Sequence, residues 1–167
     1  LIDDYLKEGS LNSKLLNEYD VFILPSNIKI EKDIIVDLFI NIRSMMEMDF
    51  DVVKNYFKLI HKHISDDGYF CNINRYISNR FFFDNKELFK DKPLNASDIA
   101  KYPYDENWKV VLSETSYRHL HVHTLITKRE KDISKSNIRK ELEKIDQISK
   151  RFIEGSLYHK IKIFKKN

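Results

Sequence analysis

The stretch VDLFINIRSMMEMDFDVVKNYF, residues 36–57, decides the fold because the spacing of its apolar residues changes along it. Its first part belongs to a continuous apolar run, 34–41, which is typical of a strand buried on both faces. After Asp49 the apolar residues recur every three or four positions, which predicts a helix that begins at Asp49 or Asp51 and stops at Asp-Asp-Gly, 66–68. A buried strand followed by an amphipathic helix indicates an α/β sheet covered on both faces.

Four more apolar runs extend this pattern. YDVFILPS (19–26) and GYFCNINRY (68–76) predict two further buried strands. WKVVLSETS (108–116) and HLHVHTLITKR (119–129) predict a hairpin, because only a few residues separate them. The expected fold is therefore α/β, with parallel strands and an antiparallel pair at the end of the sheet.

The remaining parts of the chain predict a loop and a final helix. Residues 77–107 predict a long loop that contains a short helix at 84–89. Apolar residues at helical spacing over 138–152 predict a helix capped by Ser134 or Ser136.

Length and composition indicate a single domain. The chain has 167 residues, 42% of them hydrophobic and 33% charged. This length is enough for one domain with a sizeable core and too short for two domains of ordinary size. We assign 1–167 to one domain, with 129–167 as a helical C-terminal extension. The net charge is only +3, and the basic residues after 127 are mixed with acidic ones. A solvated helix face is therefore favoured over a nucleic-acid surface.

The sequence also bears on the compartment. No apolar run approaches the roughly 20 residues of a membrane span, and no signal peptide is visible. The single cysteine, Cys71, excludes an internal disulfide and suits a reducing environment. We expect a cytoplasmic protein without a membrane span, and the sequence leaves homo-oligomer formation open. The first residue is Leu rather than Met, so these expectations apply to the printed residues only.

Four hydrogen-bonding side chains lie at and after the end of the strand at 34–41, namely Asn41, Arg43, Ser44 and Glu47. In open α/β sheets ligands bind beyond the carboxyl ends of the strands, so Asn41 and Ser44 are candidates to bind a substrate or cofactor. Arg43 and Glu47 are candidates to orient substrate hydroxyls or each other. The alternative is a capping box, with Ser44 as N-cap and Glu47 three residues later. Capping alone leaves Asn41 and Arg43 without a role.

A second polar group ends the next predicted strand at Asn74-Arg75-Tyr76. Asn74 is expected beside the first group, because the carboxyl ends of parallel strands meet at one edge of a sheet. Its amide is suited to hold a substrate hydroxyl. A turn-forming Asn, with Tyr76 in the core, is the alternative.

Three histidines, His119, His121 and His123, alternate along the last predicted strand and are expected on one face. They spread over about 13 Å at roughly 3.3 Å per residue, too far for three to ligate one tetrahedral zinc ion, and no metal site is predicted. His119 and His121 are the candidates for a general base, because imidazole titrates near neutral pH. Packing on the sheet or exposure at its edge is the alternative. His61 and His63 are expected on the solvent side of their helix.

Aromatic residues gather in and around the predicted long loop. They are Phe81, Phe82, Phe83, Tyr102, Tyr104 and Trp108. Such rings are able to stack on the apolar face of a sugar, and core or lid packing is an equal alternative.

The run 19–76 resembles a sugar O-methyltransferase family found with bacterial surface-polysaccharide genes. The shared features are a strand ending in Leu-Pro (24–25), VDLFIN followed by RSMMEM (36–41 and 43–48), a helix with Tyr-Phe (56–57) and a strand ending in Asn-Arg-Tyr (74–76). The resemblance covers this run well, the hairpin moderately and the rest weakly.

This resemblance implies the class I, Rossmann-like methyltransferase fold, in which the hairpin supplies the last two strands and the final strand is inserted antiparallel. It implies transfer of a methyl group from S-adenosylmethionine to a hydroxyl of a sugar or nucleotide sugar, without a metal ion. Pro25, Ser26 and Asn41 are the implied cofactor contacts. The sulfonium is already activated, so the protein mainly positions the reactants and removes a proton.

The resemblance also implies a Gly-rich cofactor loop that this sequence lacks. Gly9, Gly68 and Gly155 are its only glycines, and none lies in a G-x-G. We therefore expect the C-terminal part of a methyltransferase domain, without the main cofactor-binding half and inactive alone. The alternative is a non-catalytic Rossmann-like interaction module that acts through the helix at 138–152. Methylation of nucleic acid is disfavoured, because Asn41-Ile-Arg-Ser stands where an N-P-P-Y-like segment is needed.

Overall fold

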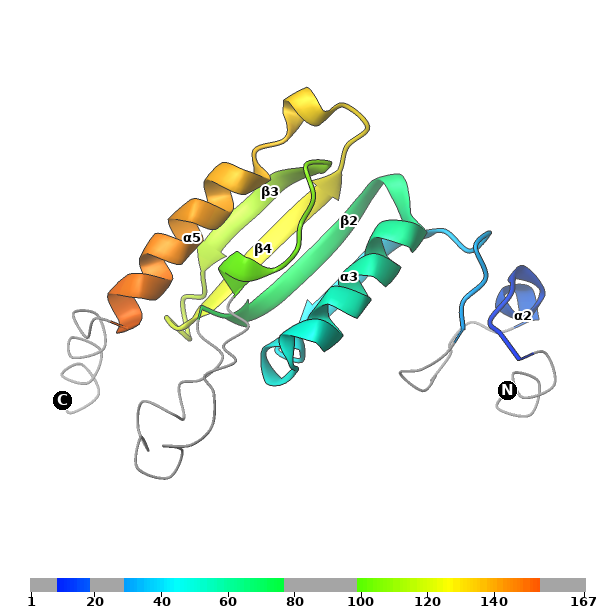
Figure 1. The fold of residues 1–167 in the computed structure, drawn as a ribbon, viewed down its shortest axis with the longest axis horizontal. Helices are drawn as coiled ribbons and strands as arrows, with labels where there is room; N and C mark the ends of the chain where they lie inside the picture. The colour runs from blue at the N-terminus through cyan, green and yellow to red at the C-terminus, as the bar shows by residue number, and fades with distance from the viewer. Residues whose placement is uncertain (1–8, 19–28, 77–98, 154–167) are drawn as a thin grey trace.

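The computed structural model describes residues 9–18, 29–76 and 99–153, and the statements below refer to these. Their strands form a four-stranded mixed sheet with helices against it, so the fold is mixed α/β (Figure 1). The elements are α2 (Ser13–Glu18), β1 (Val36–Ile42), η1 (Met45–Glu47), α3 (Phe50–His63), β2 (Ile64–Arg75), η3 (Ile99–Lys101), β3 (Trp108–Thr115), β4 (Val122–Arg129), η4 (Ile133–Lys135) and α5 (Ile138–Ile153), where η marks a short 3-10 helix.

The order of the strands across the sheet is β1-β2-β4-β3. β1 and β2 are parallel, and β4 is antiparallel to both β2 and β3. Among the four described strands, β4 therefore runs against the other three. The hairpin of β3 and β4 confirms the predicted antiparallel pair, and its second strand is inserted between β2 and β3 (Figure 1).

β1 and α3 confirm the strand and the helix predicted from residues 36–57. α3 ends earlier than predicted, because β2 begins directly after it, where Ile64 pairs with Val36 of β1. The stop predicted at 66–68 is therefore wrong: strand pairing outweighs the local turn signal. Asp67 instead takes a left-handed φ of 68° inside β2, where the register against β1 shifts.

The core lies on the face of the sheet that carries α3, η3 and α5. The ring of Phe57 in α3 lies edge-on to Phe70, Tyr102 and Tyr104, with centroid distances of 5.6, 5.8 and 4.9 Å. The same core contains Met45, Val53, Ile60, Ile64, Tyr76, Ile99, Trp108, Leu125, Ile138, Leu142 and Ile145. Tyr102, Tyr104 and Trp108 are thus core residues, as one of the two alternatives for the aromatic residues predicts.

The opposite face of the sheet is apolar and exposed in the described part of the chain. Leu38, Ile40 and Ile42 of β1 are 50 to 60% exposed, and Tyr69 and Leu112 are exposed as well. Phe39, Asn41 and Phe70, which lie next to them along β1 and β2, are less exposed, because successive side chains of a strand point to opposite faces. The prediction of a sheet covered on both faces is wrong for the described residues, since α3 and α5 pack on the same face (Figure 1).

The start of α5 also differs from the prediction. The hydroxyl of Ser134 bonds within its own turn, and that of Ser136 donates to the Trp108 carbonyl oxygen at 2.8 Å, so neither serine caps the helix. Asn137 directly precedes α5, and its side-chain oxygen accepts from the backbone N–H of Val110 at 2.6 Å. The helix start is therefore bound to β3.

Several predictions lie outside the described residues. They concern the strand at 19–26 with Pro25 and Ser26, the aromatic residues 81–83, the helix at 84–89 and the end of the chain from 154. Within the described ranges, no helix has both the length and the apolar character needed to cross a membrane.

Candidate functional site

Three buried asparagines lie at the carboxyl ends of β1 and β2. Asn41 pairs with Asn72, and Asn74 lies two residues further along β2 on the same face. The Nδ2 of Asn74 donates to Oδ1 of Asn41 at 2.8 Å and to Oδ1 of Asn72. The Nδ2 of Asn72 donates to the hydroxyl oxygen of Tyr104 at 3.3 Å. Asn41 and Asn74 thus meet as predicted, in a row of amides on the helix-covered face.

The same amides hold the turn that follows β1. The backbone N–H of Met45 donates to Oδ1 of Asn41 at 3.4 Å, and that of Met46 donates to Oδ1 of Asn74 at 3.3 Å. Buried backbone N–H groups need such partners, because an unmade hydrogen bond costs stability. Asn41 and Asn74 are therefore engaged by the protein itself.

Ser44 does not cap a helix. Its hydroxyl oxygen accepts from Nδ2 of Asn41, and it makes no capping bond to the backbone. Residues 45–47 form the separate turn η1, and α3 begins only at Phe50. The capping-box alternative for Ser44 and Glu47 is therefore wrong.

Arg43 and Glu47 lie outside the buried row. Arg43 is exposed and has a left-handed φ of 58°, and its N–H donates to the Ile73 carbonyl oxygen at 2.7 Å. Non-glycine residues seldom adopt this conformation, and such strain gathers at functional sites. The carboxylate of Glu47 lies 3.9 Å from the guanidinium of Arg75, at the long end of an ion pair. Glu47 is thus placed to meet Arg75 rather than to pair with Arg43.

The site predicted at the strand ends therefore has two layers. Asn41 and Asn74 form the inner layer, which holds the backbone. Arg43, Ser44 and Glu47 form the outer layer, and all three are exposed. A ligand at this edge of the sheet would meet the outer layer first.

The three histidines do not share a strand face. His119 and His121 lie in the turn before β4, where their ring centroids are 5.8 Å apart. The carbonyl oxygen of His121 accepts from the backbone N–H of Tyr76 at 3.0 Å, so this turn lies beside the end of β2. The prediction of a common face is wrong, because the turn takes residues 116–121 out of the strand ladder. His123 lies in β4 and is 3% exposed.

His123 belongs to a second group of polar residues, the His123 cluster, which the sequence did not predict. Its Nδ1 lies 2.7 Å from the hydroxyl of Tyr76, and its Nε2 lies 2.9 Å from the hydroxyl of Ser113. The Tyr76 hydroxyl also contacts Oγ1 of Thr115 at 2.6 Å. The Ser113 hydroxyl donates to Oε1 of Glu141 at 2.6 Å. Five residues, from β3, β4, α5 and the position directly after β2, thus form one continuous chain of hydrogen bonds.

Burial and local partners set the protonation states in this cluster. Burial lowers the pKa of His123 to about 4 and raises the pKa of Tyr76 above its ordinary value. Burial by itself raises the pKa of Glu141, but hydrogen bonds from Lys144 and Ser113 outweigh it and hold that pKa below its ordinary value. At neutral pH the imidazole and the phenol are neutral and the carboxylate is ionised.

The register of the hairpin is the signal that could have revealed this cluster. Thr115 and Asn74 both pair with His123 from opposite sides of β4. Ser113 lies two residues before Thr115 and so points to the same face. The register depends on where the turn between β3 and β4 begins. The sequence alone does not show that the turn begins directly after Thr115, so it does not give the register.

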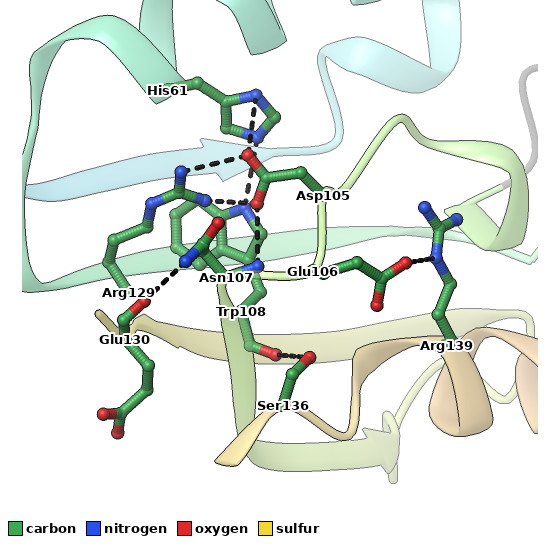
Figure 2. Close-up of polar contacts among 9 residues, drawn as sticks. All are labelled: His61, Asp105, Glu106, Asn107, Trp108, Arg129, Glu130, Ser136 and Arg139. Atoms are coloured by element: carbon green, nitrogen blue, oxygen red, sulfur yellow. Dashed lines mark hydrogen bonds and ion pairs between the residues drawn. The ribbon is translucent and has the colours of Figure 1, made fainter. Parts of the chain in front are cut away.

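A third group of polar residues surrounds Trp108 (Figure 2). Both terminal nitrogens of Arg129 donate to the carboxylate of Asp105, and the guanidinium lies over the Trp108 ring, 5.1 Å from its centroid. The indole N–H of Trp108 donates to Nε2 of His61 at 3.1 Å, and Nδ1 of that imidazole lies 3.6 Å from Asp105. The group ties α3 to both strands of the hairpin.

Both histidines of α3 face inwards, contrary to the prediction. His63 is 2% exposed, and its Nδ1 lies 2.8 Å from the Ile34 carbonyl oxygen. Burial lowers the pKa of His61, although the carboxylate of Asp105 opposes the shift. The prediction failed because residues distant in sequence, Ile34 and 105–108, pack over the end of α3.

Comparisons with known proteins add no identification. No protein-family model, curated protein or solved structure matches the chain. In residues 9–18, 29–76 and 99–153, no group of three or more His, Cys, Asp or Glu side chains is arranged to hold a metal ion. The sheet and its polar residues are therefore the features from which a function is inferred.

The holding role of the inner layer predicts the effect of Asn74→Ala. The change leaves the Met46 N–H without its acceptor and removes a donor from Asn41, so the free energy of unfolding should fall by about 2 kcal/mol. Urea unfolding monitored by circular dichroism measures it. Asn55→Ala, on the exposed side of α3, is the matched control and should change stability by less than about 0.5 kcal/mol. Equal effects of the two changes would refute the holding role.

The low pKa of His123 predicts a pH dependence of stability. The unfolded chain takes up a proton near the ordinary pKa of 6.5, whereas the folded chain resists it down to about pH 4. This contribution is fully present above pH 6.5 and is lost as the pH falls toward 4, with about 2 kcal/mol lost between pH 7 and 5. Urea unfolding at both pH values, on the parent and on His123→Gln, isolates it. An identical pH dependence in both proteins would contradict the prediction.

Proposed function

We propose that this chain contributes the acceptor side of a class I, S-adenosylmethionine-dependent O-methyltransferase. Its substrate would be a hydroxyl of a sugar or nucleotide sugar, methylated in the cytoplasm during synthesis of a bacterial surface polysaccharide. The observation that supports this most is the strand order β1-β2-β4-β3 with an inserted antiparallel β4. It is the order expected for the last strands from the resemblance of residues 19–76 to sugar O-methyltransferases.

The polar residues at the carboxyl ends of β1 and β2 support a substrate site there. Parallel strands place their ends at one edge, where ligands of open α/β sheets bind. The exposed guanidinium of Arg43, the hydroxyl of Ser44 and the carboxylate of Glu47 offer donors and acceptors of the kind that sugar hydroxyls need. Asn41 and Asn74 keep the backbone beneath them in place.

The described residues do not fit S-adenosylmethionine by themselves. The amide of Asn41, one of the implied contacts, is engaged by Ser44, Met45 and Asn74. No Gly-rich loop is present in the sequence. The proposal therefore assigns most of the cofactor contacts to residues outside this chain. The exposed apolar side chains of β1 support a further layer over this face of the sheet, because such surfaces are normally covered.

Removal of the acceptor proton is the chemical task left to this part of the protein. His119 and His121 are candidates for the base, and their turn lies next to the end of β2. Neither histidine belongs to the group of residues at the ends of β1 and β2. A substrate would therefore have to reach from that group to the turn before β4.

A non-catalytic interaction module is the second candidate function. The observation that favours it is the same exposed apolar sheet face, which a partner protein is able to cover. The internal engagement of Asn41 and Asn74 is also compatible with this role, since it leaves the asparagines with a structural task.

Cofactor binding separates the two candidates. Calorimetric titration with S-adenosylmethionine should show no binding by this chain of 167 residues and clear binding by the product of the complete gene. Unfolded protein is excluded by circular dichroism before each titration. Absence of binding by the complete product would reject the enzyme and favour the interaction module.

Arg43→Ala tests the substrate site in the complete product. Methyl transfer to the sugar acceptor should fall by about tenfold or more, because a positioning contact is lost, with little change in the free energy of unfolding. Lys140→Ala, which removes an exposed positive charge from α5, is the control and should retain activity. Full activity in Arg43→Ala would place the substrate elsewhere.

A further inference from the structure

The His123 cluster connects two positions that solvent or a ligand is able to reach. Thr115 is exposed on β3, and the side chain of Glu141 on α5 is 17% exposed. Between them Tyr76, His123 and Ser113 link through contacts of 2.6 to 2.9 Å, and His123 is nearly inaccessible. Each link is a hydrogen bond of ordinary length.

Counting hydrogens fixes the direction of every bond in the cluster. The ionised carboxylate of Glu141 only accepts, so the single hydrogen of Ser113 points to Glu141. Ser113 must then accept at its oxygen from His123, which places the hydrogen of the neutral imidazole on Nε2. Nδ1 is left as an acceptor, so Tyr76 donates to it and accepts from Thr115. All four bonds point from Thr115 toward Glu141.

We propose that this cluster is a proton-transfer chain that moves a proton from a hydroxyl compound bound at Thr115 to the carboxylate of Glu141. The compound gives its proton to Oγ1 of Thr115, and Thr115 passes its own to Tyr76. Tyr76 protonates Nδ1 of His123, Nε2 releases its proton to Ser113, and Ser113 protonates Glu141. The compound becomes an alkoxide, the carboxylate becomes a carboxylic acid, and each group between them gains one proton and loses one.

The surroundings favour this route over one with a charged intermediate. Burial disfavours both an imidazolium at His123 and a phenolate at Tyr76, so a concerted shift keeps each of them neutral. Lys144, with Nζ 2.7 Å from Oε2 of Glu141, keeps that carboxylate ionised and so able to accept a proton at neutral pH, while lowering its basicity. Among the described residues, Glu141 is the charged group that shifts the pKa of His123, and its charge raises that pKa against the effect of burial.

The proton-transfer chain lies beside the three buried asparagines, Asn41, Asn72 and Asn74. Asn74 and Thr115 flank His123 in the sheet, and all three side chains face the helices. The inference deepens the proposed function by naming a route for the proton of the acceptor hydroxyl that does not use His119 or His121, with Glu141 as the final proton acceptor. It rests on that proposal only for the identity of the hydroxyl compound.

Nuclear magnetic resonance on the full chain tests the inference without any enzymatic assay. The nitrogen shifts of His123 should report a hydrogen on Nε2 at neutral pH. The rate at which that hydrogen exchanges with water in the parent protein is the reference for the variants described below. A hydrogen on Nδ1 would overturn the proposal.

Two variants interrupt the chain at different links. Ser113→Ala and the isosteric Thr115→Val should each slow exchange at His123 by about tenfold and leave that of the buried indole hydrogen of Trp108 unchanged, because a proton must enter one end as another leaves the other. Glu143→Gln, on the exposed side of α5, is the control and should leave both rates unchanged. If Ser113→Ala does not fold, Thr115→Val decides alone. Unchanged exchange at His123 in a folded variant would refute the proposal, whether or not the complete product transfers methyl groups.

Discussion

The parallel pairing of β1 with β2 is the interaction on which the rest of the structure depends. Parallel neighbours require a crossover rather than a tight turn, and α3 is that crossover. Because α3 must lie against the sheet, it brings Phe57 onto Phe70 and fixes which face becomes the core. Because both strands run in the same direction, Asn41 and Asn74 meet at one edge. The core and the candidate site follow from one pair of strands.

The sequence predicts the elements whose signal is local and fails where a distant partner decides. β1, α3 and the β3–β4 hairpin follow from the spacing of apolar residues, which the chain carries within each segment. The end of α3 depends instead on pairing of Ile64 with Val36, and Ser136 bonds to Trp108, 28 residues away, rather than capping α5. His63 is buried against Ile34 for the same reason. Turn and cap preferences are worth about 1 kcal/mol, less than the strand pairs and core contacts that compete with them.

The sequence predicts where the candidate site lies, but it does not predict which of its residues hold the backbone and which are exposed. In the sequence, Asn41 and Arg43 are both polar residues near the end of a strand, which predicts a similar position for their side chains. In the structure the amide of Asn41 points inward, whereas Arg43 is exposed and has a strained backbone conformation. The histidines show the same limit. The hairpin turn ends at His121 and β4 begins at Val122, so the ring of His121 lies in the turn whereas the imidazole of His123, two residues later, is buried.

The insertion of β4 between β2 and β3 bears on how the chain folds. Contacts within the hairpin are local, such as Ser113 with His123 at a separation of 10 residues, and β1, α3 and β2 form a second unit that is continuous in sequence. Contacts between the units are far apart in sequence, as in Tyr76 with His123 at a separation of 47. Closing so long a loop costs entropy before any contact repays it. We expect the two units to form early and the docking of β4 on β2 to limit the folding rate, so that the edge of β2 stays open to wrong partners until β4 occupies it.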